Sequence, residues 1–418
     1  MSLGGVSRRF VRGNLMLSIA VVVATFLTAD PASVRASPIT VLNNGPSSNR
    51  VDMVFLGDGY TAAELNTTYV THINSMVDYM FSGGQDPFPR YSNFFNIHRI
   101  DVVSNERGAD IPPLNVFRDT ALDASYFTGG IDRLLYINES KANNALATGL
   151  SGASFGAEMR LVTVNDTRYG GGGGNYAVYA GGNPSATEIA LHELGHSFSR
   201  LADEYSDGGP IRYTGPEPSQ VNLTTNPTGA KWSRWLGHSE PSFGTIGAYE
   251  GAGYSEFGLF RPSFDSKMRS LDRPFDAISR EKFILDIYSL VDPLDSWLDN
   301  SGVLVDPAYL AVDVVDPAVI KINWFVDGEL VAGAEGETFR LNEFGFGPGR
   351  YLVTARASDT NPDWVRVNLD QLEQSIAWDV LQTTRTVPQA PTLLLFGTSA
   401  AGLALVRWRQ RKRANPYL

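Results

Sequence analysis

One hexapeptide, L-H-E-L-G-H at 191–196, constrains this chain more than any other stretch. It contains the pattern H-E-x-x-H, whose histidines, His192 and His196, would lie about 6 Å apart along a helix and on the same side of it. Two imidazoles in this arrangement suit one zinc ion, and Glu193 can lie beside a water at that ion and take its proton. The pattern therefore predicts a helix that carries two ligands of one zinc ion per chain and a catalytic base.

The residues around the hexapeptide favour an amphipathic helix. Ser185 and Glu188 have the spacing of a capping box, which predicts a helix that starts at Ser185. Four apolar residues then fall on one face, roughly 160° away from the histidines: Leu191, Leu194, Phe198 and Leu201. We expect the helix to bury this face and to present both histidines to a cleft.

A third protein ligand is expected, because a catalytic zinc ion usually has three. The chain has no cysteine, so the ligand must be a histidine or a carboxylate. A straight helix would carry Asp203 about 10 Å beyond His196. The helix must therefore turn near Arg200 if Asp203 is to come back to the metal.

Strand patterns alternate with helix patterns before the hexapeptide. Strands are expected at 39–42, 51–56, 94–103, 134–137 and 159–164, and a helix is expected from 61 to about 81. This alternation predicts an α/β (α+β) fold with a mixed sheet for the domain at 37–300.

Five consecutive glycines at 170–174 lead into a short strand pattern at 175–180. An edge strand beside a metal cleft can pair with an extended peptide, so a substrate strand is expected to lie against 175–180. The alternative is a flexible linker followed by an ordinary strand. Residues 206–260 have little periodicity and are expected to line or cover the cleft.

The sequence changes character after a helix pattern at 278–290. Residues 320–331 read as a strand, an Asp-Gly turn and a second strand, and further strand patterns follow to about 380. These patterns predict a small immunoglobulin-like β-sandwich at 301–386. It carries no chemical motif, so a packing or binding module is the expectation.

The N-terminal residues 1–36 have the order of a secretory signal peptide. Three arginines precede an apolar run at 15–27, and small residues near Ala36 suit cleavage. The alternative is an uncleaved membrane anchor, although thirteen apolar residues are few for a transmembrane helix.

The C-terminal residues 387–418 begin with V-P-Q-A-P, continue as an apolar segment and end in five basic residues from Arg407 to Arg413. This tail resembles, as a variant, the PEP-CTERM sorting signal of Gram-negative bacteria. The resemblance implies a sorting transpeptidase of the inner membrane as a partner; the alternative is a plain C-terminal anchor. Either way the body is expected outside the inner membrane: in the periplasm, on the cell surface or secreted, and transiently or stably anchored.

Charge separates the body of the chain from its ends. The net charge is −11, while residues 1–36 carry +3 and the tail from Arg407 carries +5, so the middle carries −19. An acidic body does not suggest nucleic acid as a partner, because phosphate binding needs a basic surface.

Four segments together resemble the bacterial IgA-peptidase-like metallopeptidases, a family related to the metzincins. They are H-E-L-G-H-S-F-S-R-L-A-D-E-Y at 192–205, V-F-L-G-D-G-Y-T at 54–61, the tyrosine and glycine run at 169–174, and R-P-S-F-D-S-K-M-R at 261–269. The resemblance implies a zincin-like domain that cleaves peptide bonds, with Met268 in a Met-turn beneath the metal. The alternative for Met268 is an ordinary core methionine.

The chain departs from the metzincin pattern just after the second histidine. Ser199 and Ala202 stand where that pattern has a glycine and a ligand, and Asp203 comes one residue later. Asp203 is the favoured third ligand and Glu204 the alternative, followed by two more distant candidates, Glu217 and His238. Support for an oxyanion is expected from a tyrosine, with Tyr254 and Tyr213 as candidates.

The predicted function is therefore that of an exported zinc endopeptidase that acts on a protein or peptide substrate, with Glu193 as its general base. One alternative is a non-catalytic surface or matrix-binding protein on a zincin scaffold, and the intact Glu193 speaks against it. Another is a zinc hydrolase of non-peptide amide bonds, such as those of the cell wall.

Overall fold

The computed structural model describes residues 37–383, which divide into two compact units. The first unit runs to Asp295 and also includes Val315–Ile320 and Asp359–Glu373. The second comprises Ser296–Val314, Lys321–Ser358 and 374–383.

The predicted signal peptide at 1–36 and sorting tail at 387–418 lie outside the described residues. Among residues 37–383, no helix has the length and apolar character needed to cross a membrane.

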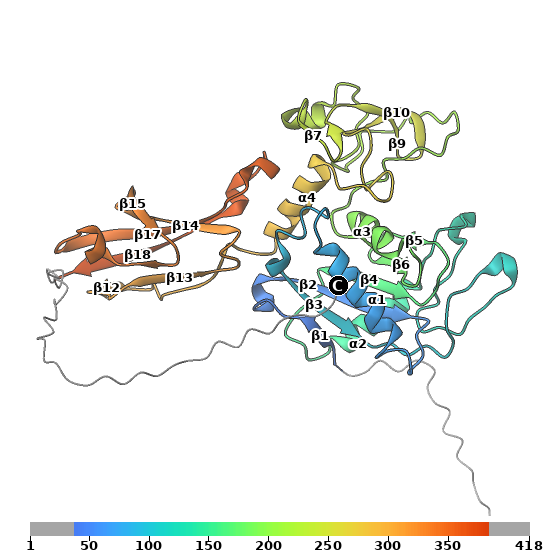
Figure 1. Ribbon diagram of the computed structural model, residues 1–418, viewed down its shortest axis with the longest axis horizontal. Coiled ribbons are helices and arrows are strands. Elements are labelled where there is room, and N and C mark those ends of the chain that lie inside the picture. Colours follow the sequence, from blue (N-terminus) through green and yellow to red (C-terminus); the bar gives the residue numbers. More distant parts are fainter. Residues whose placement is uncertain (1–36, 384–418) are drawn as a thin grey trace, which may run out of the picture. The chain divides into compact units, whose positions relative to one another are not determined.

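A six-stranded mixed sheet forms the centre of the first unit (Figure 1), with the spatial order β1-β3-β2-β4-β6-β5. Its strands are β1 (Ile39–Leu42), β2 (Val51–Asp58), β3 (Phe95–Ile100), β4 (Met159–Val164), β5 (Gly171–Gly172) and β6 (Ala177–Ala180). The four inner strands run parallel, whereas β1 and β5 pair antiparallel with their neighbours. The mixed α/β character expected from the sequence is confirmed.

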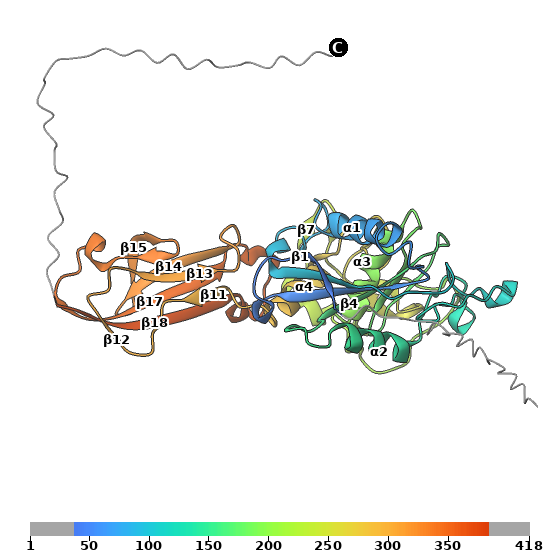
Figure 2. The ribbon, with the colours of Figure 1, turned by 90° about the horizontal axis from the view of Figure 1, so that it is seen from below.

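Helices cover both faces of this sheet. Figure 2 shows α1 (Thr68–Met80) and α3 (Ala186–Ser197) on one face and α2 (Glu139–Gly149) on the other. Every residue of β2 is consequently buried. The helix expected from residue 61 begins only at Thr68, and residues 62–67 form turns in which the Glu64 carboxylate accepts hydrogen bonds from the backbone and hydroxyl of Thr61.

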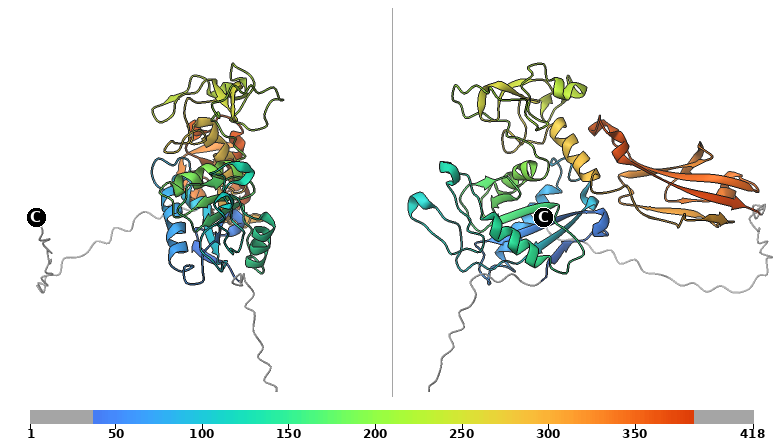
Figure 3. Two further views of the ribbon diagram at one scale, coloured as in Figure 1. Left: turned by 90° about the vertical axis from the view of Figure 1, so that its right-hand side faces the viewer. Right: turned by 180° about the vertical axis from the view of Figure 1, so that it is seen from behind.

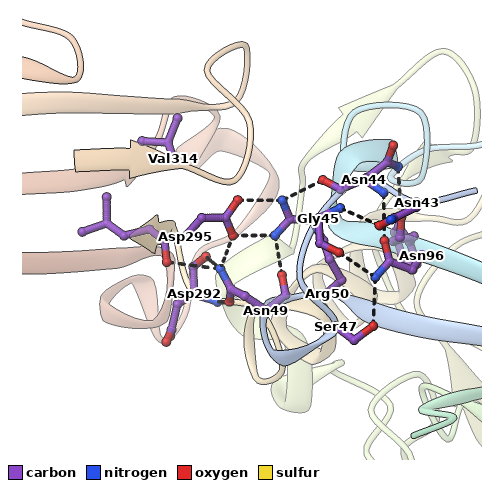
Figure 4. Close-up of polar contacts among 12 residues, drawn as sticks. Asn43, Asn44, Gly45, Ser47, Asn49, Arg50, Asn96, Asp292, Asp295 and Val314 are labelled. Atoms are coloured by element: carbon purple, nitrogen blue, oxygen red, sulfur yellow. Dashed lines mark hydrogen bonds and ion pairs between the residues drawn. The ribbon is translucent and has the colours of Figure 1, made fainter. Parts of the chain in front are cut away.

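A buried ion pair fastens the start of β2 to the end of the first unit (Figure 4). The Arg50 guanidinium donates to both carboxylate oxygens of Asp295, at 2.6 and 2.7 Å. Asn49 Nδ2 donates to the same carboxylate at 2.8 Å, and Asn49 Oδ1 accepts from the Asp292 backbone. A bidentate pair with such additional partners compensates for much of the desolvation of its charges.

Residues 206–261 contain little regular structure and form a lobe on the α3 side of the sheet (Figure 3). Two short hairpins lie in it: β7 (Ser239–Glu240) with β8 (Gly244–Thr245), and β9 (Tyr249–Ala252) with β10 (Ser255–Arg261). A small apolar core joins this lobe to α4 (Ala277–Tyr288) and includes Trp232, Trp235 and Ile278.

The remaining strands form two sheets, ordered β12-β18-β17-β14-β15 and β11-β13-β16. Their bounds are β11 (Leu294–Trp297), β12 (Val303–Val305), β13 (Leu310–Val314), β14 (Ile320–Val326), β15 (Glu329–Glu335), β16 (Thr338–Phe339), β17 (Gly349–Asp359) and β18 (Glu373–Gln382). Stacked aromatic rings fill the space between the sheets. The ring centroid of Trp324 on β14 lies 5.1 Å from that of Phe339 on β16 and 5.7 Å from that of Trp378 on β18. All three side chains are buried, so these strands have an apolar core of their own.

Candidate metal centre

Helix α3 carries the H-E-x-x-H pattern and begins where the sequence predicts, with Ser185 as its N-cap. The expected capping box is wrong, because the Ser185 side chain makes no capping hydrogen bond. Glu188 instead accepts hydrogen bonds from Lys267 Nζ at 2.6 Å and from the Asp272 backbone at 2.9 Å. The glutamate thus anchors the loop at 267–272 to the helix.

Three ligand atoms converge at the exposed side of α3. His192 Nε2 and His196 Nε2 lie 3.1 Å apart. Asp203 Oδ1 lies 3.1 Å from the first and 3.2 Å from the second. Tetrahedral zinc with bonds of about 2.0–2.1 Å separates its ligands by roughly 3.3 Å, so this triangle has the size that the ion requires.

Both histidines are oriented by backbone carbonyls. His192 Nδ1 lies 2.9 Å from the carbonyl of Lys267, and His196 Nδ1 lies 2.8 Å from that of Leu201. A carbonyl can only accept a hydrogen bond, so each Nδ1 carries the proton and each Nε2 lone pair is left for a metal. The donor set and its supports therefore fit a zinc ion.

The chain turns sharply after α3, and this turn delivers Asp203. The helix ends at Ser197, and Arg200 adopts a left-handed φ of 56°. The Leu201 backbone then bonds back to the Gly195 carbonyl at 2.9 Å. Burial alone would raise the pKa of Asp203, but its contacts with His192 and His196 outweigh the effect of burial and hold that pKa far below its ordinary value.

The other proposed third ligands lie elsewhere. Glu204 is fully buried and accepts hydrogen bonds from Asn222 at 2.9 Å and Ser266 at 2.7 Å, so its carboxylate points away from the histidines. Glu217 is held by Lys231 and Thr225. His238 contacts Glu240 at 2.8 Å.

Glu193 lies beside the two histidines, and its ligand atom is within 4.8 Å of theirs. Its carboxylate is largely buried beneath Gly171, where an added β-carbon would lie 2.8 Å from Oε1. Burial raises the pKa of Glu193, and the charges of His192 and His196 oppose this rise. A carboxylate with a raised pKa is a better proton acceptor near neutral pH than an ordinary one.

Met268 lies directly behind the metal ligands. Its side chain is fully buried, and an added β-carbon on Gly195 would lie 2.6 Å from its Sδ. Its carbonyl accepts the Glu204 backbone N–H at 2.8 Å, next to the Lys267 carbonyl that faces His192. The methionine thus supports the helix from below without reaching the ligand atoms of the histidines.

The glycine run packs closely over α3. An added β-carbon on Gly173 would lie 2.5 Å from His196 Cβ, and one on Gly171 would lie 2.4 Å from Ile189 Cγ2. The proposed substrate-binding edge at 175–180 is wrong, because β6 is paired with β4 on one side and β5 on the other. The edge of the sheet beside the cleft is formed instead by β5, and the backbone of 133–135 forms hydrogen bonds with Gly171 in β5.

The two candidate tyrosines have different positions. The Tyr254 hydroxyl donates to Asp203 Oδ2, and the Tyr254 ring lies 5.3 Å from that of Tyr205. Tyr254 therefore belongs to the site and holds the carboxylate oxygen that does not face the histidines. Tyr213 is not brought to the metal centre: its hydroxyl donates to the Pro216 carbonyl, and its backbone bonds to Phe257.

A cleft of about 560 Å³ opens on these residues. Its lining includes Tyr254 and several residues that sequence reasoning missed: Arg133, Tyr136, Tyr205 and Lys267. Nothing local marks Arg133 or Tyr136, since they lie about fifty residues before α3. Tyr169, directly before the glycine run, is the one lining tyrosine that this run could have indicated.

An H-E-x-x-H helix, a converging aspartate and a buried glutamate beside them make this centre one of the metallopeptidase type. Residues 39–245 match the family model described as IgA Peptidase M64. The chain thus belongs to an IgA-peptidase-like metallopeptidase family, which supports a peptidase, and the mixed α/β structure of the described residues is consistent with a peptidase domain. The match includes His192, Glu193, His196 and Asp203. No curated protein matches the chain.

Proposed function

We propose that this chain is a zinc-dependent endopeptidase in which Glu193 is the general base. The observation that supports it best is the convergence of His192, His196 and Asp203 to within 3.2 Å beside Glu193, at the floor of a cleft. An open cleft suits an extended peptide, which passes through the site rather than ending in it.

The residues have separate tasks in this reaction. Zinc held by the two histidines and Asp203 would supply a Lewis acid that acidifies water and polarises the scissile carbonyl. Glu193 accepts the proton of the attacking water and then donates it to the leaving amine. Its burial excludes bulk solvent from the carboxylate and so favours both transfers.

Tyr254 orients the carboxylate of Asp203. By donating to Oδ2, its hydroxyl leaves Oδ1 directed at the histidines. Support of an oxyanion by Tyr254 requires its hydroxyl to turn from Asp203 toward the substrate, and its place in the cleft lining is compatible with that movement.

We further propose that the first unit is zincin-like and that the two-layer β-structure of the second is immunoglobulin-like. The antiparallel edge strand β5 above α3 supports the first assignment. The stacked Trp324 and Phe339 between two sheets support the second. The sandwich lacks a chemical site among its described residues, so its proposed role is packing or binding.

Export and sorting remain proposals from the sequence. The charged, apolar and small-residue order of 1–36 supports a cleaved signal peptide, and the apolar and basic order of 387–418 supports sorting by a membrane transpeptidase. N-terminal sequencing of the mature protein and fractionation of cells that express the chain with and without 387–418 would test both.

Zinc content and peptide cleavage together test the proposed activity. The purified protein should hold about one zinc ion per chain and cut an unfolded protein. Glu193→Gln should retain zinc and reduce cutting by at least about 100-fold. Glu217→Gln is the matched control, since Glu217 lies outside the cleft lining, and it should retain both properties. Cutting that survives Glu193→Gln would contradict the mechanism, and bound zinc without any cutting would favour the non-catalytic alternative.

A further inference from the structure

The lining of the cleft is unusually cationic for so acidic a chain. Four basic residues take part in it, although the side chain of Lys267 is itself fully buried: Arg133, Arg200, Lys267 and Arg269. The only acidic residues in the lining are Glu193 and Asp203, which belong to the metal centre. The rest of the cleft wall therefore has the opposite charge sign to the body of the protein, which carries −19 between its basic ends.

Two of these four cations already have carboxylate partners. Lys267 is buried against Glu188 at 2.6 Å, and Arg269 lies 3.6 Å from Asp265. Arg133 and Arg200 form no direct ion pair with any residue in 37–383, and Arg133 interacts with Asp203 and Glu193 only over a longer distance. Both are exposed, so their charges are available to a molecule that enters the cleft.

Arg133 is fixed next to the reacting region. Its carbonyl accepts the Gly171 backbone N–H at 3.2 Å, and Gly171 covers the Glu193 carboxylate. Its Nη2 donates to the Tyr205 hydroxyl at 3.2 Å, and its guanidinium lies 5.7 Å from the Tyr205 ring centroid. A neutral hydroxyl occupies one N–H of a guanidinium that has five, and the others remain for an anion.

Arg200 lies just beyond the C-terminal end of α3. It follows the last turn of α3, one helical turn beyond His196, and its left-handed backbone is part of the turn that delivers Asp203. Both arginines line the cleft that contains the metal ligands, Arg133 through the segment that bonds to Gly171 and Arg200 through the turn after α3.

We propose that this cleft selects peptides that carry a carboxylate close to the scissile bond, with Arg133 as the main specificity-determining residue and Arg200 as a second contact. The inference rests on the proposed peptidase function and adds its substrate class. A guanidinium recognises a carboxylate by paired, charge-assisted hydrogen bonds. The carboxylate is supplied by an aspartate or glutamate side chain, or by a C-terminus that lies some residues beyond the scissile bond.

Matched peptides test this selectivity in the full-length, zinc-loaded protein. A quenched fluorescent peptide that is cut by the protein is remade with Glu, Gln or Lys at each position next to the scissile bond, and each form is made with a free or an amidated C-terminus. We expect kcat/KM to be about tenfold higher for Glu than for Gln at one position at least, or for the free C-terminus over the amide. The position of the effect identifies the source of the carboxylate.

Arginine variants then assign the preference to a residue. Arg133→Gln should reduce the acid-to-amide ratio to near one, Arg133→Lys should keep part of it, and Arg133→Glu should favour the Lys peptide. Arg212→Gln is the control, because Arg212 also lies over an aromatic ring, that of Phe257, but outside the cleft lining. It should leave the ratio unchanged.

Binding provides a readout that does not depend on turnover. In a Glu193→Gln background, fluorescence polarisation should show tighter binding of the acidic peptide than of its amide, and the difference should disappear with Arg133→Gln. Equal cleavage and binding of acidic and amide peptides, or a ratio that survives Arg133→Glu, would overturn the inference while leaving the peptidase function intact. Failure to cleave any peptide would instead count against the peptidase function.

Discussion

Gly195 and Met268 are packed so closely that a β-carbon on the glycine would lie 2.6 Å from the methionine Sδ. The contact explains a glycine in the interior of a helix, where alanine is ordinarily more stable by about 1 kcal/mol. It also places a fully buried side chain directly behind the backbone between the two histidines.

Gly195→Ala should therefore destabilise the protein, against the usual helix preference. Overpacking of this kind costs about 1–3 kcal/mol, and movement of α3 should also weaken zinc binding. Thermal unfolding and zinc titration measure the two effects. Met268→Leu combined with Gly195→Ala should cost less than the sum of the single changes, and a higher Tm for Gly195→Ala alone would contradict the packing described.

Asp203 and its neighbour Glu204 should respond differently to substitution. Asp203→Ala removes a ligand and should lower zinc affinity by more than about 100-fold. Glu204→Gln should keep zinc, because that side chain bonds to Asn222 and Ser266 instead, but it should cost about 1–3 kcal/mol of stability through the altered hydrogen bonds. Zinc content after dialysis and the free energy of unfolding separate the two roles; loss of zinc from the Glu204 variant alone would reverse the assignment.

The buried ion pair of Lys267 and Glu188 should be essential to the loop beneath the metal. Lys267→Met leaves the Glu188 charge buried without its partner and should cost about 3–5 kcal/mol. Zinc affinity should fall as well, since the Lys267 carbonyl orients His192.

Two further variants make the Lys267 result specific. The double variant Glu188→Leu and Lys267→Met should recover most of the lost stability, because no unpaired charge is then buried. Lys282→Gln removes a partly exposed pair with Asp286 and should cost less than about 1 kcal/mol. Equal losses for Lys267→Met and Lys282→Gln would show that burial of the first pair does not matter.

Glu217 should contribute stability that depends on pH. Partial burial alone would raise its pKa, but hydrogen bonds from Lys231 and Thr225 outweigh it and lower the pKa from 4.5 to about 2. A lowered pKa stabilises the folded protein above pH 4.5, and this contribution is lost as the pH falls from 4.5 toward 2. The difference in Tm between the wild type and Glu217→Gln, measured with a chelator present, should be constant above pH 5 and shrink below it. A difference that grows on acidification would contradict this sign.

Sequence reasoning reached the parts of the site that are local in the chain. The helical spacing of His192 and His196 and the apolar face that includes Leu191 and Leu194 depend on periodicity alone. The strand patterns of the central sheet were recognisable for the same reason, because parallel strands buried on both faces are uniformly apolar.

Features that depend on distant partners could not be predicted. The choice between Asp203 and Glu204 is made by a left-handed Arg200 and by the buried hydroxyl of Ser266, sixty-two residues from Glu204. Glu188 has capping-box spacing but bonds to Lys267, because a buried cation is a stronger partner than the helix end. The wrong prediction of a substrate-binding edge at 175–180 has a similar origin. The strand that pairs with β6 consists of Gly171 and Gly172, whose sequence has no strand pattern.

The glycines above the helix limit how this site can change over evolution or in engineering. Gly171 and Gly173 meet Glu193 and His196 through bare backbone, and any side chain at either position would collide with them. The glycine segment that covers the metal centre therefore has no side chains that substitution could use to change substrate selectivity. New preferences must come from its two borders, 131–136 and 269–271, so a library confined to these stretches is expected to redirect the cleft while leaving Glu193, the ligands and the supporting residues Lys267 and Met268 unaltered.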